Sequence, residues 1–161
     1  MLDNWRPLSL IKSDAKIFTK ILSNRLNAIL PKLINQYQTG FMPGRLIANN
    51  GWALQTMMAH ARNIDANGTT AGALLDQEKA HDRIHPEYLT KALMKFGFPE
   101  AFVKTITAMF FQTKVHTAIN GYLATPITQG RGLRQGDPIS PLLFNLGFEP
   151  LLHKLLAEVH L

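Results

Sequence analysis

The sequence predicts an α+β fold in which helices lie on one face of a small, largely antiparallel sheet. Apolar residues recur at helical spacing in several segments. In one further segment, apolar and polar residues alternate on both sides of a predicted tight turn, and one short apolar run ends at an aspartate. With 161 residues, of which 46% are hydrophobic and 17% charged, the chain suits one domain with a buried core. Helices gathered on one side of such a sheet are typical of α+β domains.

The N-terminal half predicts two helices joined by a loop. Helical spacing begins at Asp14, a good N-cap residue, and continues to Leu30, where Pro31 should bend or restart the helix. The segment 38–45 is rich in glycine and proline, which predicts a loop. A second helix is expected from about Ile47 to Ala61.

The next segment predicts a strand followed by two helices. The run AGALL at 71–75 is short and apolar and predicts a buried strand that ends at Asp76. Pro86 at a first helical position and Gly97 just past the end predict a helix over 86–96. Pro99 then opens another helix.

The last third predicts a hairpin and a long helix. Alternating residues on both sides of Asn120-Gly121 are a strong hairpin signal over 115–127. A glycine-rich loop at 129–137 follows. Ser140 is then expected to cap a helix that runs to about Ala157.

Charge and composition limit the function classes. Residues 1–50 hold seven lysines and arginines against two aspartates, a balance of +5 within the net charge of +6. This asymmetry favours a polyanion partner, although an ordinary solvated basic face would look the same. No run approaches the roughly 18 apolar residues of a membrane span, no signal peptide begins the chain, and no cysteine is present. We expect an intracellular protein, nuclear or cytoplasmic, with no membrane partner.

Asp76 is the first candidate for chemistry. An unpaired carboxylate at the end of a buried strand, on the edge of a sheet, costs free energy. Binding of Mg²⁺, which prefers carboxylate oxygens as ligands, would offset that cost. A strand-end aspartate that caps the following turn is the alternative. A zinc pair at His81 and His85 is disfavoured because no third ligand is evident and Pro86 interrupts the helix.

Four motifs, in order, resemble one known family. Residues 75–83, LDQEKAHDR, resemble motif A of non-LTR (LINE-type) reverse transcriptases. Residues 4–10, NWRPLSL, and 38–45, QTGFMPGR, resemble the two fingers motifs of that family, and 134–144, RQGDPISPLLF, resemble its motif B. The resemblance implies a right-hand polymerase domain, with fingers at about 1–70 and palm at about 71–161.

The resemblance also implies roles for particular residues. Asp76 matches the aspartate that binds both catalytic Mg²⁺ ions, and Gln77 matches the position whose backbone carbonyl joins one of them. Arg6 matches an arginine that contacts the incoming triphosphate. Gln135 and Gly136 match residues that line the nucleotide pocket, where glycine lets the backbone approach a ligand closely.

His81 departs from the family pattern. The family usually has Tyr or Phe at this position, where the ring stacks beneath the sugar and excludes a 2′-hydroxyl. Imidazole is smaller and polar, so weakened exclusion of ribonucleotides is expected, and His81→Tyr should restore it. Drift in a degenerating copy of the element is the simpler alternative. The charges of Glu78, Lys79, Asp82 and Arg83 are expected to serve structural ion pairs.

The resemblance implies an RNA-directed DNA polymerase that uses an RNA template, a DNA primer, dNTPs and two Mg²⁺ ions. The aromatic-Ala-Asp-Asp hairpin that follows motif B in the family does not occur in the 161 residues. We therefore expect an incomplete fingers and palm, truncated before that motif and inactive by itself. The alternative is a non-catalytic remnant that at most binds RNA through its basic N-terminal helices. An unrelated basic helical protein would require four accidental motifs.

Overall fold

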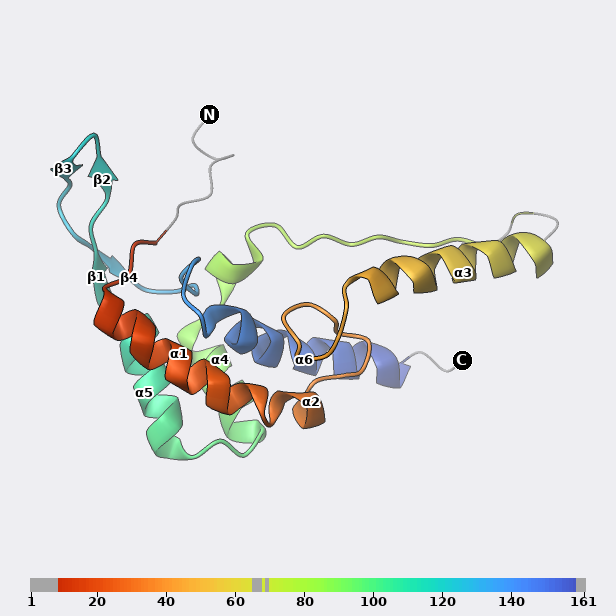
Figure 1. The fold of residues 1–161 in the computed structure, drawn as a ribbon, viewed down its shortest axis with the longest axis horizontal. Helices are drawn as coiled ribbons and strands as arrows, with labels where there is room; N and C mark the ends of the chain where they lie inside the picture. The colour runs from red at the N-terminus through yellow and green to blue at the C-terminus, as the bar shows by residue number, and fades with distance from the viewer. Residues whose placement is uncertain (1–8, 65–67, 69, 159–161) are drawn as a thin grey trace.

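The computed structural model describes residues 9–64, 68 and 70–158. In this part of the chain there are six α-helices, one 3-10 turn and two short antiparallel strand pairs, so the predicted α+β class is confirmed. Most helices pack into one body, from which a hairpin and a long helical arm project (Figure 1).

The first helices follow the predicted pattern with one change at the start. Helix α1 spans Ser13–Asn27, and no side chain caps it; the Asp14 carboxylate instead accepts the Ala15 N–H at 2.8 Å within the first turn. A negative charge there still favours the helix start through the helix dipole. The short helix α2, Leu30–Leu33, restarts at the predicted proline.

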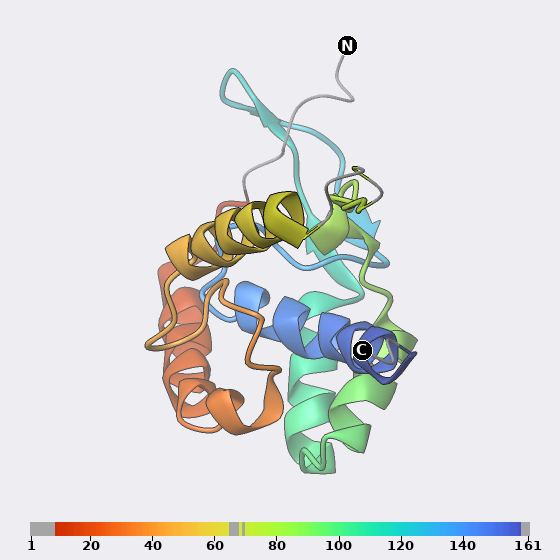
Figure 2. The same cartoon turned by 90° about the vertical axis from the view of Figure 1, so that its right-hand side faces the viewer.

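Three later helices supply most of the core. Helix α4, Pro86–Lys95, agrees with its predicted range to within one residue, and helix α5, Glu100–Phe110, begins directly after Pro99, which was predicted to open it. Helix α4 lies against both α5 and α6, Ser140–Glu158, and α6 runs through the middle of the body with α4 and α5 on one side and α1 on the other (Figure 2). The core contains these buried apolar residues: Leu26, Leu30, Ile34, Met42, Ile84, Leu89, Leu93, Phe98, Val103, Ile106, Phe110, Phe111, Leu133, Ile139, Leu142, Leu143 and Leu146.

The strands form the predicted hairpin. Strands β1 (Thr113–Val115) and β4 (Ile127–Gln129) pair antiparallel near the body, and β2 (Ala118–Ile119) and β3 (Tyr122–Leu123) pair near the tip. The turn residues Asn120 and Gly121 both have positive φ, 49° and 84°. Two positive φ angles define the tight turn that matches strand twist, which explains why Asn-Gly predicted it.

The predicted cap at Ser140 is wrong. Ser140 is the first residue of α6, and its buried hydroxyl has no hydrogen-bond partner. The carboxylate of Asp137 accepts the Ile139 N–H at 3.2 Å, and the Asp137 carbonyl accepts the Ser140 N–H at 3.1 Å. Asp137 therefore organises the entry to the helix.

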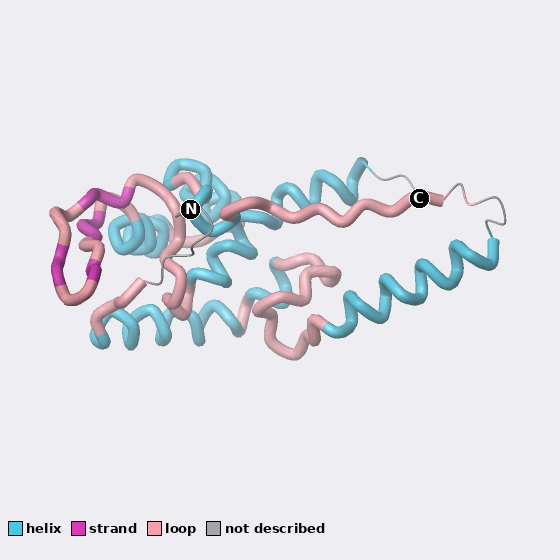
Figure 3. Tube along the Cα trace, turned by 90° about the horizontal axis from the view of Figure 1, so that it is seen from above, coloured by secondary structure: helices cyan, strands magenta, loops and turns pink. Residues whose placement is uncertain are grey.

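The predicted buried strand at 71–75 is also wrong. These residues form an exposed extended segment, in which Leu74 and Leu75 are 87% and 94% exposed. A strand needs a neighbour for its backbone N–H and C=O groups, and the described residues provide none for 71–77. The segment returns from helix α3, Ala48–Ile64, which buries none of its residues, and together they form the arm (Figure 3).

No helix in the described ranges combines the length and apolar character needed to cross a membrane.

Candidate functional site

The turn of the predicted motif A follows the extended segment. Lys79 adopts a left-handed conformation (φ 52°), and the 3-10 turn η2, Ala80–Arg83, comes directly after it. Arg83 and Glu78 form an exposed ion pair at 2.8 Å across this turn. These two charges therefore stabilise the turn locally, as expected for structural roles, although an exposed pair adds little stability.

The glycine-rich loop before motif B packs directly on that turn. The Gly132 N–H donates to the Ile84 carbonyl at 2.8 Å, and the Leu133 N–H donates to the His81 carbonyl at 2.9 Å. Gly132 has φ +90°, and a Cβ there would lie 3.0 Å from the Cα and carbonyl oxygen of Asp82. Only glycine allows such a close backbone approach without displacement. The turn of motif A is thus joined by backbone hydrogen bonds to the loop that leads directly into motif B.

Arg134 holds the same loop from the other side. Its guanidinium lies 5.1 Å from the centre of the Phe110 ring and donates a hydrogen bond to the Met109 carbonyl. Burial lowers the pKa of Arg134, while the nearby Asp137 carboxylate opposes this shift. The loop is therefore attached to the C-terminal end of α5 by an arginine that lies over an aromatic ring.

The predicted nucleotide-pocket residues lie at the end of this loop. Gln135 is half-buried and Gly136 is exposed. The Gln135 carbonyl accepts the Ser9 N–H at 3.3 Å, which brings the last described residues of the first fingers motif to motif B. Arg6, the predicted triphosphate ligand, lies outside the described residues.

His81 faces helix α6. Its imidazole stacks on the Phe144 ring with a centroid distance of 4.6 Å and an interplanar angle of 19°. Burial lowers the pKa of His81, and the Asp82 carboxylate opposes this shift. Motif A therefore contacts motif B itself through the His81 side chain, in addition to the backbone contacts with the preceding loop.

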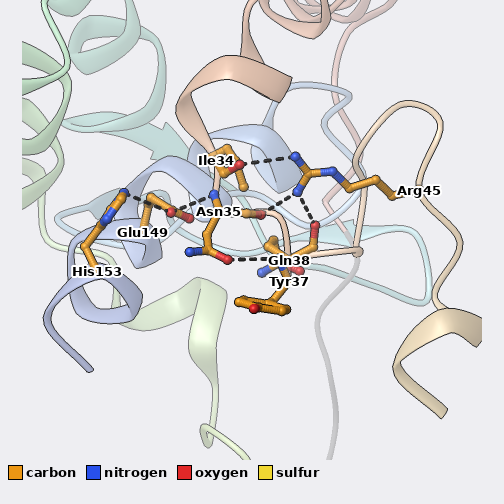
Figure 4. Close-up of polar contacts among 7 residues, drawn as sticks. All are labelled: Ile34, Asn35, Tyr37, Gln38, Arg45, Glu149 and His153. Atoms are coloured by element: carbon orange, nitrogen blue, oxygen red, sulfur yellow. Dashed lines mark hydrogen bonds and ion pairs between the residues drawn. The ribbon is translucent and has the colours of Figure 1, made fainter. Parts of the chain in front are cut away.

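A second anchor holds the predicted fingers loop to α6 (Figure 4). The Arg45 guanidinium donates to three backbone carbonyls, those of Ile34, Asn35 and Gln38, at 3.1, 2.5 and 2.7 Å. The Gln38 side chain accepts the N–H of Gly40 at 3.0 Å. Arg45 of the second fingers motif therefore shapes its own loop with three hydrogen bonds, a use that suits a planar group with several donors.

Helix α6 completes this anchor with residues that the motif comparison missed. The Asn145 amide donates to the Gly40 carbonyl at 2.8 Å, and the fully buried Glu149 carboxylate accepts the Asn35 N–H at 2.7 Å. His153 lies 3.2 Å from the same carboxylate. Positions 145, 149 and 153 form a polar stripe at four-residue spacing in a mainly apolar helix. That stripe is a signal that the sequence alone contained.

A shallow cavity of about 510 Å³ lies where α1, the fingers loop and the start of α6 meet. Its lining includes the buried Thr39, whose hydroxyl has no hydrogen-bond partner. The full lining is Ser23, Asn27, Thr39, Phe41, Met42, Pro43, Arg45, Pro138, Pro141 and Leu142. The cavity therefore joins residues of the second fingers motif to residues of motif B.

Asp76 and Gln77 lie on the exposed extended segment. No hydrogen bond or ion pair between described residues joins either of them to the motif B loop. A carboxylate and a carbonyl without a backbone partner are the hard oxygen donors that Mg²⁺ prefers. However, no group of three or more metal-ligating side chains occurs among the described residues. The fit to Mg²⁺ is therefore partial, with one carboxylate available.

The comparisons with known proteins agree with the motifs. Residues 2–161 match the family described as reverse transcriptase (RNA-dependent DNA polymerase). Because this match covers nearly the whole chain, the chain belongs to the reverse transcriptase family.

Within that family the similarity is to proteins of non-LTR retrotransposons, as predicted. The chain is 37% identical over 152 residues to the 149 kDa protein of transposon TX1 from Xenopus laevis, covering 94% of this chain and 12% of that protein. It is 28% identical over 156 residues to the Pol polyprotein of element R2DM from Drosophila melanogaster, covering 97% of this chain and 14% of that protein. It is 29% identical over 153 residues to the RNA-directed DNA polymerase of mobile element jockey from the same organism, covering 90% of this chain and 16% of that protein. The chain thus spans about 12 to 16% of the length of these relatives.

Proposed function

We propose that residues 1–161 form the fingers and part of the palm of an RNA-directed DNA polymerase of a non-LTR retrotransposon. The fingers comprise about 1–70 and the palm segment about 71–161. One observation carries the proposal: the loop before motif B packs backbone to backbone on the motif A turn at Gly132, so two motifs far apart in sequence share one site.

Nucleotide binding is assigned to residues around this junction. Gln135, which is half-buried, and Gly136, which is exposed, are assigned to the nascent base pair on the strength of their motif. Arg6 is assigned to the triphosphate on the strength of its motif, since guanidinium matches phosphate geometry. His81 is assigned to the sugar. These groups bind and orient the nucleotide; none of them is assigned a proton-transfer role.

Asp76 and the Gln77 carbonyl are assigned to Mg²⁺, which in such enzymes supplies charge neutralisation at the triphosphate. Two ions need more carboxylates than Asp76 provides, and no group of three or more metal-ligating side chains occurs among the described residues. The 161-residue chain alone is therefore expected not to extend a primed RNA template, and its partners in synthesis are RNA template, DNA primer and dNTPs. Template-dependent extension by this chain that Asp76→Ala abolishes would contradict that expectation.

The proposal is tested by grafting. Residues 1–161 replace the matching segment of the jockey polymerase, and primer extension on an RNA template is measured. Extension should be lost with Asp76→Ala and retained with Asp14→Ala, which removes another exposed carboxylate. Primer–template binding by gel shift shows that the graft is folded. A graft that binds but does not extend, or that extends without Asp76, overturns the proposal.

A second function has its own support. Lys12, Lys16 and Lys20 recur every fourth residue and are exposed along α1, where a shallow groove of about 420 Å³ is lined by Lys16, Lys20 and the apolar Ile17 and Ile21. Such a face suits an RNA backbone without any catalysis. In this case RNA binding should weaken steeply with salt, and Lys16→Gln with Lys20→Gln should reduce both the affinity and the salt slope. Binding that is insensitive to salt would contradict it.

A further inference from the structure

Three rings form a column between motif A and the middle of α6. His81 stacks on Phe144 at 4.6 Å, and Phe144 stacks on Phe148 at 5.7 Å with an interplanar angle of 15°. Residues four apart lie on the same face of a helix, so Phe144 and Phe148 are held together by α6 itself. The stack of rings therefore links helix α6 to the His81 imidazole on the short turn η2.

The backbone of His81 is fixed independently of its ring. Its carbonyl accepts the Leu133 N–H at 2.9 Å, and the adjacent Asp82 N–H donates to Lys79 at 2.9 Å. With the backbone held, the remaining freedom of the side chain is rotation of the imidazole. Stacking within 19° of the Phe144 plane determines that rotation, because stacked rings have a restricted set of favourable arrangements.

The surroundings of the ring also favour its neutral form. Burial lowers the pKa of His81; Asp82, on the same turn, is the charged group that opposes the shift. On α6 the ring faces uncharged aromatic residues. The loop that packs on the turn contributes the Leu133 amide, and Arg134 beside it is directed to Phe110. A neutral imidazole has one donor and one acceptor nitrogen, whereas a phenyl ring has neither.

We propose that Phe144, backed by Phe148, is a positioning residue that sets the plane of the His81 imidazole and therefore the edge that this ring presents to a nucleotide sugar. The inference rests on the proposed function, in which His81 lies at the sugar. Phe144 acts through His81, so the sugar preference of the site depends on a residue of motif B as well as on motif A.

The first test needs only the 161-residue protein. The His81 ring protons are followed by NMR through a pH titration in wild type, Phe144→Leu and Phe148→Leu. Phe144→Leu should remove the ring-current shift of the His81 protons and raise the His81 pKa toward the ordinary value, and Phe148→Leu should do both to a smaller extent. Phe144→Tyr retains a ring and should retain the wild-type signals.

A matched control comes from a second ring pair. Phe98 and Phe102, which lie just before and within α5, stack at 5.2 Å and make no ring contact with His81, so Phe102→Leu removes a similar contact elsewhere in the protein. The His81 signals should not change in this variant. If Phe144→Leu does not fold, Phe148→Leu and Phe144→Tyr still decide the matter. His81 signals that are identical in wild type and all folded Phe144 and Phe148 variants overturn the inference.

The second test separates this inference from the proposed function. In the jockey graft, the ratio of deoxyribonucleotide to ribonucleotide incorporation is measured for His81→Tyr and Phe144→Leu. Both should change the ratio, with nucleotide KM affected more than primer–template binding. A ratio that changes with His81→Tyr but not with Phe144→Leu refutes the positioning role alone. A ratio that neither variant changes refutes the assignment of His81 to the sugar, whatever the NMR result.

Discussion

Substitution of Gly132 by alanine tests the contact between motifs A and B most directly. The new methyl group would lie 3.0 Å from the Cα and carbonyl oxygen of Asp82, and φ at this position is +90°. Backbone atoms cannot move aside as a flexible side chain can. The loop must therefore move away from the turn, which lengthens or breaks the two hydrogen bonds to Ile84 and His81.

The expected destabilisation has two parts. A non-glycine residue in a left-handed conformation costs about 1–2 kcal/mol. Each lost hydrogen bond costs about 0.5–1.5 kcal/mol. Gly132→Ala should therefore lower the free energy of unfolding by about 2–5 kcal/mol.

Two other glycines separate these parts. Gly44 has φ +72° but open space around it, so Gly44→Ala should show only the conformational cost, about 1–2 kcal/mol. Gly130 has open space and no positive φ, so Gly130→Ala should change stability by less than about 0.5 kcal/mol. Urea unfolding followed by circular dichroism gives all three values, and hydrogen exchange at the Leu133 amide reports on the loop. If Gly132→Ala lowers the free energy of unfolding by no more than Gly44→Ala does, and the Leu133 amide stays protected from exchange, the tight contact is refuted.

Three further predictions concern single side chains. Glu149→Ala leaves the Asn35 N–H without its partner and should lower the free energy of unfolding, measured in urea, by about 1–3 kcal/mol. Glu158 is exposed, so Glu158→Ala should have no measurable effect. Equal effects of the two substitutions would refute the anchoring role of Glu149. Because the folded-state pKa of His81 is lowered, the unfolded chain binds more protons between that pKa and 6.5, so this residue makes stability fall as pH falls through that window. His81→Gln should remove that part of the pH dependence, and unfolding curves from pH 5 to 8 that superimpose on wild type would contradict it. His81→Tyr in the jockey graft should restore exclusion of ribonucleotides, and equal incorporation of both sugars by the two versions would oppose this.

Local sequence signals predicted most elements correctly because their causes are local. Pro86 and Gly97 marked a helix whose ends depend on φ preferences, and Asn120-Gly121 marked a turn that needs two positive φ angles. The cap at Ser140 failed because the carbonyl of the preceding residue, Ile139, already accepts the Leu142 and Leu143 N–H groups, at 3.1 and 3.0 Å, that a capping hydroxyl would accept. A single-residue preference cannot show which of two nearby acceptors is used.

The candidate site was only partly predictable. The motifs pointed to His81, Gln135 and Gly136, but not to Phe144 as the partner of His81 or to Glu149 as the anchor of the fingers loop. The polar stripe of α6 was visible in the sequence, yet its partner, the backbone of Asn35, lies more than a hundred residues away. Contacts of this kind depend on how helices pack.

By itself, the sequence determined the family, the order of the motifs and the positions of the helices and the hairpin, because each depends on residue identity within a short window. The tertiary structure decided which motifs touch: the Gly132 loop on the Asp82 turn, and the His81 ring on Phe144. It also decided that 71–75 is not a strand, since strand formation requires a neighbouring backbone that none of the described residues supplies.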